Sequence, residues 1–297
     1  MVRDIPLAPP QHEHWTKQEA ERYCRDLAKT HYENFTVGSF FVPRELRQHM
    51  YNIYAFCRHS DDLGDEVGDP NRSLELLGAW EHELDQCYQG VVSHPVYVAL
   101  QETIAKFDLP KAPFWRLIQA FKQDQTKTRF QTFSEVLNYC EYSANPVGHL
   151  VLYLFGYRDP ERQKLSDFTC TALQLANFWQ DVDRDLAIGR IYLPLEDLHR
   201  FKVTEEDLKA KRATKEFKAL MAFQVDRTQE LFYHGLALVK QVKGLFKIDL
   251  EAFSLGGLAV LKGIEKVDYD VLSTRPVVSR GTKLKITFSL FKSFIFG

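Results

Sequence analysis

The chain has 297 residues, 45% of them hydrophobic, so it can bury a sizeable core as one large helical domain or two ordinary ones. Its 38 Lys and Arg residues nearly balance 40 Asp and Glu residues, which leaves a net charge of −2. Without a basic excess there is no electrostatic footprint for a nucleic-acid backbone, so we do not expect a nucleic-acid partner.

The five cysteines are spread along the chain without a C-x-x-C pair. This spacing fits neither a disulfide framework nor a thiolate zinc site, and it favours a reducing cytosol. Residues 1–14 lack the apolar stretch of a secretory signal, and no run of about 18 apolar residues occurs elsewhere. We therefore expect a cytoplasmic protein that does not span a membrane.

Apolar residues recur mostly at three- and four-residue spacing, whereas alternation with period two is scarce, so we predict an all-α fold. Residues that break helices separate segments of about 15 to 30 residues, which is helix length. These breakers are Pro43, the stretch from Gly64 to Pro70, His94-Pro95, Pro110 to Pro113, Pro146, Asp159-Pro160, Pro194 and Gly256-Gly257. No polar linker divides the chain, so a single domain over residues 1–297 is the simpler prediction.

The first acidic cluster lies in the segment R-H-S-D-D-L-G-D-E, residues 58–66. Asp61 and Asp65 are four residues apart, which places both carboxylates on one face of a helix. Arg58 lies on an adjoining face, and its guanidinium would match phosphate oxygens bidentately. The alternatives are a solvated acidic helix face and a surface salt bridge from Arg58 to its neighbours.

The second acidic cluster, in L-Q-L-A-N-F-W-Q-D-V-D-R-D-L, places Asn177, Asp181 and Asp185 at successive four-residue steps of a helix. Like charges at this spacing repel, and burial beside Phe178 costs more unless a cation compensates. Carboxylate oxygens suit Mg²⁺, which takes one or two carboxylates together with water and phosphate oxygens. We therefore predict a metal–diphosphate site across which both clusters face each other, with Arg190 of G-R-I-Y-L-P as a further phosphate ligand.

The last helical segment places Leu284, Phe288, Phe291 and Ile295 on one stripe, with lysines nearby. Such a stripe over residues 284–297 would suit a helix at the inner surface of the cell membrane. A helix that closes the core is the equal alternative. The sequence does not indicate an oligomeric state.

Residues 15–285 resemble the squalene/phytoene synthase family, the head-to-head prenyl synthases. The resemblance is carried by R-x-x-x-Y-x-x-Y-A-F-C-R before D-D-x-x-D-E, and by N-x-x-x-D-x-x-x-D before G-R-I-Y-L-P. It implies a single isoprenoid synthase domain, a helical bundle around a central apolar cavity that takes a prenyl diphosphate. It also implies two or three Mg²⁺ ions between the aspartate motifs.

The resemblance implies the following site residues. We expect Asp61, Asp65, Asp181 and Asp185 to hold the metal ions. The expected catalytic residues are Glu33, Tyr54, Arg58 and Asn177, and the expected substrate-binding residues are Arg58, Tyr139, Tyr142, Asn145, Phe178 and Arg190.

Three segments resemble the bacterial hydroxysqualene synthases of the hopanoid pathway: H-Y-E-N-F-T-V at 31–37, the run from Gln123 to Arg129, and Y-C-E-Y-S-A-N-P-V-G at 139–148. This branch converts presqualene diphosphate and water to hydroxysqualene and diphosphate, and we expect no NADPH. Glu33 stands where relatives offer a basic residue to the diphosphate. We hypothesise that it helps to deliver the water, with a capping or salt-bridged glutamate as the alternative.

Two other functions remain open at this stage. One is a presqualene diphosphate, squalene or phytoene synthase that condenses two prenyl diphosphates. The other is a non-catalytic protein that binds a prenyl lipid, although such a protein could tolerate the loss of the two aspartate motifs that are intact here.

Overall fold

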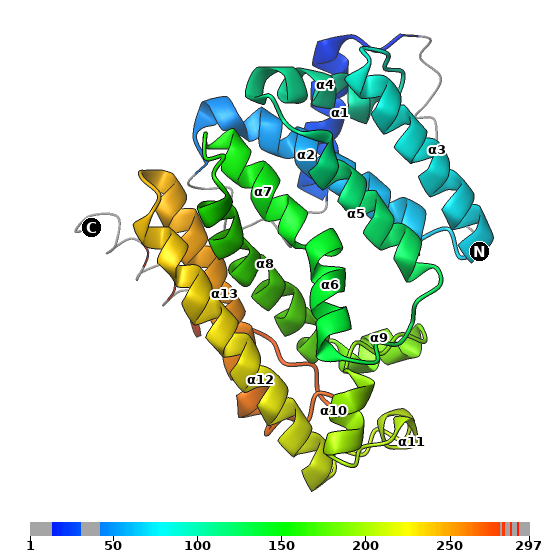
Figure 1. The fold of residues 1–297 in the computed structure, drawn as a ribbon, viewed down its shortest axis with the longest axis vertical. Coiled ribbons are helices and arrows are strands. Elements are labelled where there is room, and N and C mark those ends of the chain that lie inside the picture. Colours follow the sequence, from blue (N-terminus) through cyan, green and yellow to red (C-terminus); the bar gives the residue numbers. More distant parts are fainter. Residues whose placement is uncertain (1–13, 31–41, 280, 283–285, 287–289, 291–297) are drawn as a thin grey trace. The chain divides into compact units, whose positions relative to one another are not determined.

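The computed structural model describes residues 14–30, 42–279, 281–282, 286 and 290, and every regular element in these residues is helical (Figure 1). Their one strand-like pairing is an isolated parallel bridge between Arg129 and Ile191. The predicted all-α fold is therefore confirmed. Glu33 and the predicted stripe Leu284/Phe288/Phe291/Ile295 lie outside the described residues.

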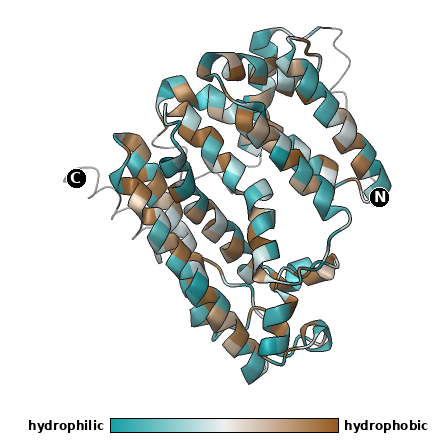
Figure 2. Ribbon diagram, in the orientation of Figure 1, coloured by the Kyte–Doolittle hydropathy of each residue, from teal (hydrophilic) through white to brown (hydrophobic). Residues whose placement is uncertain are grey.

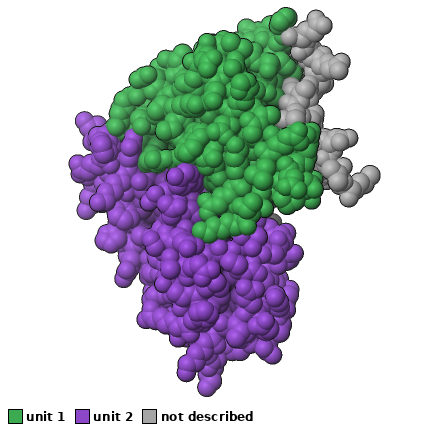
Figure 3. Space-filling model, turned by 45° about the vertical axis from the view of Figure 1, so that its right-hand side comes forward, with its two compact units in different colours: residues 1–127, 146–158 green, residues 128–145, 159–297 purple. Residues whose placement is uncertain are grey.

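The chain divides into two compact units, residues 1–127 with 146–158 and residues 128–145 with 159–297 (Figure 3). The prediction of one domain over residues 1–297 stays a prediction.

The helices are α1 (Lys17–Thr30), α2 (Arg44–Asp65), α3 (Pro70–Tyr88), α4 (Pro95–Phe107), α5 (Lys111–Asp124), α6 (Phe133–Ser143), α7 (Asn145–Leu154), α8 (Pro160–Gln180), α9 (Val182–Ala187), α10 (Leu195–Arg200), α11 (Glu205–Lys209), α12 (Lys215–Gly235), the 3₁₀ helix η2 (Leu236–Lys240) and α13 (Leu245–Lys266).

Several helices begin where the breaker residues predict. Asp69 is the N-cap of α3 and accepts a hydrogen bond from the Arg72 N–H at 2.7 Å. Asp159 caps α8 in the same way through the Arg162 N–H at 2.9 Å. In both helices a proline fills the first helical position, where its missing N–H removes no hydrogen bond.

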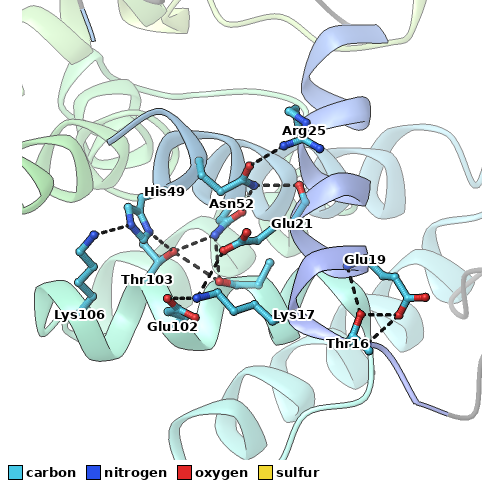
Figure 4. Close-up of polar contacts among 12 residues, drawn as sticks. Thr16, Lys17, Glu19, Glu21, Arg25, His49, Asn52, Glu102, Thr103 and Lys106 are labelled. Carbon is cyan, nitrogen blue, oxygen red and sulfur yellow. Dashed lines mark hydrogen bonds and ion pairs between the residues drawn. The ribbon is translucent and has the colours of Figure 1, made fainter. Parts of the chain in front are cut away.

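In the first unit, α2 is tied to α1 and α4 by a polar network (Figure 4). The fully buried Asn52 of α2 donates to the Ala99 carbonyl at 2.9 Å and to Thr103 Oγ1 at 3.0 Å, both on α4. Gln48 of α2 donates to the Glu21 carbonyl of α1 at 2.8 Å. Buried polar groups are costly without partners, so this network fixes the register of α2, the helix that carries the first acidic cluster.

The core of the first unit is aromatic around Phe56. Its ring stacks on Trp80, with ring centroids 5.9 Å apart, and meets Phe114 edge-on at 5.0 Å.

Hydrophobic and hydrophilic residues alternate around the helices in Figure 2, the pattern of amphipathic helices that each bury one face.

In the second unit, α8 and α12 run antiparallel, and α13 packs against both (Figure 1). Trp179 near the end of α8 donates to Thr228 Oγ1 of α12 at 2.8 Å. Thr169, ten residues earlier on α8, is the nearest neighbour of Gly235 at the end of α12. This pairing holds the end of α8, and with it the second acidic cluster, against a rigid helix.

The predicted joint at Gly256-Gly257 is wrong, because both glycines lie inside α13. A Cβ at position 257 would stand 2.1 Å from Cζ of Phe232 on α12, whereas a Cβ at position 256 would meet nothing within 4 Å. Gly257 therefore permits the close approach of two helices instead of ending one.

Candidate active site

The first acidic cluster lies at the C-terminal end of α2. Asp61, Asp62 and Asp65 belong to its last turns, Glu66 is its C-cap, and the last turn holds no basic residue. The C-terminal end of a helix carries partial negative charge, so carboxylates are disfavoured there. This end of α2 therefore favours a cation.

The pKa of Asp61 is raised in this crowded acidic cluster. Burial, and then the charge of Asp65, raise the pKa of the Asp61 carboxyl to about 6, although Arg58 opposes the shift. A carboxyl that resists ionisation next to another carboxylate gains more from a bound divalent ion than an exposed one does. Asp61 and Asp65 therefore fit the predicted role of oxygen ligands.

Arg58 pairs with the carboxylates that follow it on the same helix. Its Nη1 lies 3.1 Å from Asp61 Oδ2, its Nη2 donates to Glu66 Oε1 at 2.7 Å, and it also contacts Asp62. The salt-bridge alternative is thus present in this structure. Tyr54 lies one turn earlier on α2 and is half-buried, which raises its pKa, and the charges of Arg58 and Asp61 also influence this pKa. The three side chains form one electrostatic group.

The second acidic cluster is bent at its middle residue. α8 ends at Gln180, Asp181 has the non-helical dihedrals φ −107° and ψ 18°, and α9 begins at Val182. The four-residue hydrogen bonds nevertheless continue, from the Asp181 N–H to the Asn177 carbonyl and from the Asp185 N–H to the Asp181 carbonyl, both at 2.9 Å. The predicted spacing is therefore kept although the helix is interrupted, and the Asn177 side chain is exposed.

Arg275, which sequence reasoning missed, covers Asp181 in this structure. Its Nε donates to Asp181 Oδ1 at 2.5 Å and its Nη2 to Oδ2 at 3.0 Å, so both carboxylate oxygens are engaged. The next residue, Pro276, accepts a hydrogen bond from the buried Gln180 side chain at 2.6 Å. No spacing rule connects residues 94 positions apart, and the only available signal was an arginine after the last core helix.

Asp185 and Arg190 line one pocket of the second unit, together with Phe178 and Tyr192. The lining of this pocket thus includes a cationic, an acidic and two aromatic residues. Phe178 and Tyr192 stack almost parallel, with ring centroids 3.7 Å apart and an interplanar angle of 5°. The structure therefore brings Arg190, which the sequence predicts as a phosphate ligand, to the same pocket as Asp185 of the second acidic cluster.

The predicted substrate-binding residues from the segment 139–148 are placed differently from one another. Tyr139 is 4% exposed, and its ring lies 6.1 Å from that of Phe178 and 5.9 Å from that of Tyr192. Asn145 is buried and accepts a hydrogen bond from Thr171 Oγ1 of α8 at 2.9 Å. Tyr142 is half-buried. Tyr139 therefore belongs to the aromatic group beside the pocket.

Within the described residues, no three His, Cys, Asp or Glu side chains are grouped so as to hold a metal ion. The chemistry of the donors nevertheless fits Mg²⁺, because both clusters offer oxygen donors, carboxylates in each and the Asn177 amide in the second. The raised pKa of Asp61 and the acidic end of α2 are the observations that favour a cation.

The model of the squalene/phytoene synthase family matches residues 28–282. The chain belongs to this family. The structure resembles squalene synthase HpnC from Alicyclobacillus acidocaldarius with a TM-score of 0.81 and 48% identity, covering 85% of this chain and 95% of the other. A dehydrosqualene synthase solved with a ligand has a TM-score of 0.84 and 26% identity, covering 94% and 97%. The phytoene synthase of Arthrospira platensis is 29% identical over 91% of both chains.

The family membership confirms the predicted resemblance and makes this chain an enzyme of a family of synthases that process prenyl diphosphates. Members of the family bind prenyl diphosphates and use a divalent metal to ionise them. Among the described helices, none is long and apolar enough to cross a membrane.

Proposed function

We propose that the enzyme converts presqualene diphosphate and water to hydroxysqualene and diphosphate. The observation that carries this proposal is the pocket in which Asp185 and Arg190 meet the faces of Phe178 and Tyr192. Ionisation of a prenyl diphosphate produces an anion and a carbocation next to each other. A site for it needs charged groups for the departing anion and aromatic residues for the cation, and residues of both kinds line this pocket.

The proposed reaction is balanced without a redox partner. The C–O bond to the diphosphate breaks and its electron pair leaves with the diphosphate. The rearranged cation forms a new C–O bond to water, and the water gives up one proton to a base. No hydride enters the product, so NADPH is not required.

The charged residues receive the departing anion in this proposal. Asp61, Asp65, Asp181 and Asp185 would hold two or three Mg²⁺ ions, which when bound neutralise the charge that develops on the diphosphate. Arg58 and Arg190 would exchange their present contacts for phosphate oxygens, because a guanidinium binds carboxylate and phosphate with the same geometry. Asn177 would support the ligands of the second cluster. The two clusters would converge on one diphosphate.

The aromatic residues would stabilise the cation and keep bulk water away from it. Each face contributes about 0.5 to 2 kcal/mol to a cation that it contacts. Phe178 and Tyr139 belong to one stacked group in the second unit, and Tyr54 lies beside Arg58 in the first. A ring lining also limits premature capture of the cation by solvent.

The choice of this branch of the family rests on similarity and on one departure in sequence. Identity is 48% to squalene synthase HpnC but only 26% and 29% to the dehydrosqualene and phytoene synthases compared above. Glu33 would repel a diphosphate, whereas it could orient or deprotonate a water molecule.

Product analysis of the purified enzyme with presqualene diphosphate and Mg²⁺ tests the proposed reaction. We expect hydroxysqualene both with and without NADPH, and no product when the metal is chelated. Squalene that forms only in the presence of NADPH would contradict the proposal.

The second candidate is the condensation of two prenyl diphosphates, which the similarity to phytoene synthases over 91% of the chain favours. Incubation with farnesyl diphosphate and Mg²⁺ separates the two candidates. A condensing enzyme consumes farnesyl diphosphate, whereas a hydroxysqualene synthase leaves it unchanged.

The role of Glu33 has its own test. We expect Glu33→Gln to lower the rate of hydroxysqualene formation by about 100-fold, the lower end of the range for general base catalysis. The affinity for inorganic pyrophosphate should stay the same, because the residue acts on water. A normal rate in this variant would remove Glu33 from the mechanism.

The substrate and product are very apolar, so we propose that residues 284–297 bring the enzyme to the inner surface of the cell membrane. Binding to vesicles of anionic phospholipid should fall when these residues are deleted. Unchanged vesicle binding would assign the segment to the core instead.

A further inference from the structure

Arg190 sits directly after a tightly fixed helix end. α9 ends at Ala187, and Gly189, the residue after its C-cap Ile188, has φ +82°, a left-handed conformation that glycine adopts without strain. The Gly189 N–H donates to the Leu186 carbonyl at 2.9 Å, and the Arg190 N–H donates to the Asp185 carbonyl at 2.8 Å. This is the Schellman arrangement of a helix C-terminus. The main chain of Arg190 is therefore tied to Asp185, its partner in the pocket.

Thr128 and Arg129 together hold the main chain on both sides of Arg190. On the far side, the Ile191 N–H donates to the Thr128 carbonyl at 3.0 Å, within the isolated parallel bridge between Arg129 and Ile191. On the near side, Arg129 Nη1 donates to the Gly189 carbonyl at 2.6 Å. Residues 128–129 thus hold the neighbours of residue 190, Ile191 through a backbone contact and Gly189 through a side-chain contact.

The guanidinium of Arg129 is itself anchored at a second point. Its Nε donates to Glu205 Oε1 at 2.8 Å and its Nη2 to Glu205 Oε2 at 2.9 Å, a bidentate pair. Glu205 begins α11, a short helix whose N-cap Thr204 forms a capping box with Asp207. Leu208 of this helix lines the same pocket as Arg190. The Arg129 guanidinium therefore links Gly189, which precedes the pocket residue Arg190, to α11, which carries the pocket residue Leu208.

We propose that Arg129 is a positioning residue that holds Arg190 in place for the diphosphate. The inference rests on the proposed function, in which Arg190 binds phosphate oxygens. The Arg129 side chain acts through the Gly189 carbonyl, not on the substrate. Its role accounts for a residue of the run from Gln123 to Arg129 that the sequence motif alone left without a function.

A double-mutant cycle on binding tests this role. The probe is inorganic pyrophosphate with Mg²⁺, and its dissociation constant is measured by calorimetry for wild type, Arg129→Met, Arg190→Met and the double variant. We expect each single variant to raise the dissociation constant by about ten-fold. The double variant should be no weaker than Arg190→Met, because a misplaced arginine and a missing one lose the same contact.

Arg212→Met is the matched control. Arg212 also pairs with a carboxylate of α11, donating through Nη2 to Asp207 Oδ1 at 2.6 Å. We expect this variant to bind pyrophosphate as wild type does. A loss equal to that of Arg129→Met would show that any loosening of α11 suffices, and would overturn the specific role of Arg129.

Two further results are decisive. If Arg190→Met weakens binding and Arg129→Met does not, or if the two losses multiply in the double variant, the positioning role is wrong and the role of Arg190 stands. If Arg190→Met itself binds normally, the proposed phosphate contact of Arg190 fails and the inference fails with it.

Glu205→Gln keeps the measurement informative if Arg129→Met does not fold. This variant leaves the contact between Arg129 and the Gly189 carbonyl in place and removes only the charge of its anchor. We expect a loss of about two- to three-fold in pyrophosphate affinity, with an unchanged far-ultraviolet circular dichroism spectrum. No loss in a folded Glu205→Gln protein together with no loss in Arg129→Lys would overturn the proposal.

Discussion

At Asp181, an ion pair would compete with the proposed metal binding. Both of its carboxylate oxygens accept hydrogen bonds from the Arg275 guanidinium, and Arg184 Nε lies 3.6 Å from Oδ1. A divalent ion that binds Asp181 must displace part of this pairing. The arginine that leaves the carboxylate then becomes available for the incoming phosphate oxygens, since a guanidinium forms forked hydrogen bonds with both.

We predict that Arg275→Gln binds Mn²⁺ more tightly than wild type in the absence of diphosphate. Removing a partly exposed ion pair changes the free energy of binding by about 1 kcal/mol, which corresponds to about five-fold in affinity. Electron paramagnetic resonance of free Mn²⁺ measures this. Arg162→Gln, whose carboxylate partner is Asp159, is the control and should bind as wild type does. Weaker binding by Arg275→Gln would show that the arginine supports the metal site instead of competing for it.

At the scale of the elements, two neighbouring glycines of α13 have opposite roles. Gly257 lies against Phe232, which is fully buried and has no room to move, whereas the space beside Gly256 is open. Glycine in a helix interior lowers stability relative to alanine unless packing requires it. Substitution of Gly256 therefore reports the effect of backbone entropy, and substitution of Gly257 reports the effect of helix packing, within a single turn of α13.

We expect Gly257→Ala to lower the free energy of unfolding by about 1 to 3 kcal/mol through overpacking. Gly256→Ala should raise it by about 0.5 to 1 kcal/mol, because alanine restricts the unfolded chain and meets no obstacle. Urea denaturation of both variants beside wild type measures the difference. Equal effects in the two variants would show that α12 and α13 do not approach each other as closely as the structure has them.

At the scale of the whole molecule, one buried acid ties global stability to pH. Asp249 of α13 is 3% exposed, and its Oδ1 has no hydrogen-bond partner among the described residues. Burial alone raises the pKa of its carboxyl to about 8, from an ordinary value of 3.8. The folded state therefore keeps a proton that the unfolded state releases, and stability falls as pH rises from about 4 to about 8.

We predict that Asp249→Asn removes this dependence, because the amide has nearly the same shape and does not titrate. The gain in stability over wild type should grow by about 1.4 kcal/mol for each pH unit across this range. Urea denaturation at pH 5, 6 and 7 gives the slopes. Parallel slopes for the two proteins would mean that Asp249 is ionised in the folded state.

The sequence predicted the helical fold and several of its joints, because proline and capping residues act locally. Pro70, Pro95 and Pro160 each start a helix as their neighbours Asp69, His94 and Asp159 indicate. The error at Gly256-Gly257 has a physical cause, since a glycine that admits a neighbouring helix looks the same in sequence as one that ends a helix. Only the partner residue Phe232 distinguishes the two cases.

For the candidate site, spacing along one helix predicts Asp61 and Asp65 as metal ligands, and the short-range motif predicts Arg190 as a phosphate ligand. The contacts of Arg275 with Asp181 and of Arg129 with Gly189 depend on residues far apart in the chain. Periodicity cannot predict such contacts, because they arise only when helices pack. The motifs therefore predict the chemistry of the site, and the structure adds the distant residues that contact the predicted site residues.

The acidic end of α2 has one more consequence. Four carboxylates gather where the peptide dipoles already place negative charge, so this last turn is the part of the helix that gains most from a divalent ion. Chelation should then make residues 61–66 fray while the segment around Phe56 stays closed. Amide hydrogen exchange would show this fraying as faster exchange confined to that turn. The metal would then stabilise the C-terminal turn of α2 as well as the leaving group.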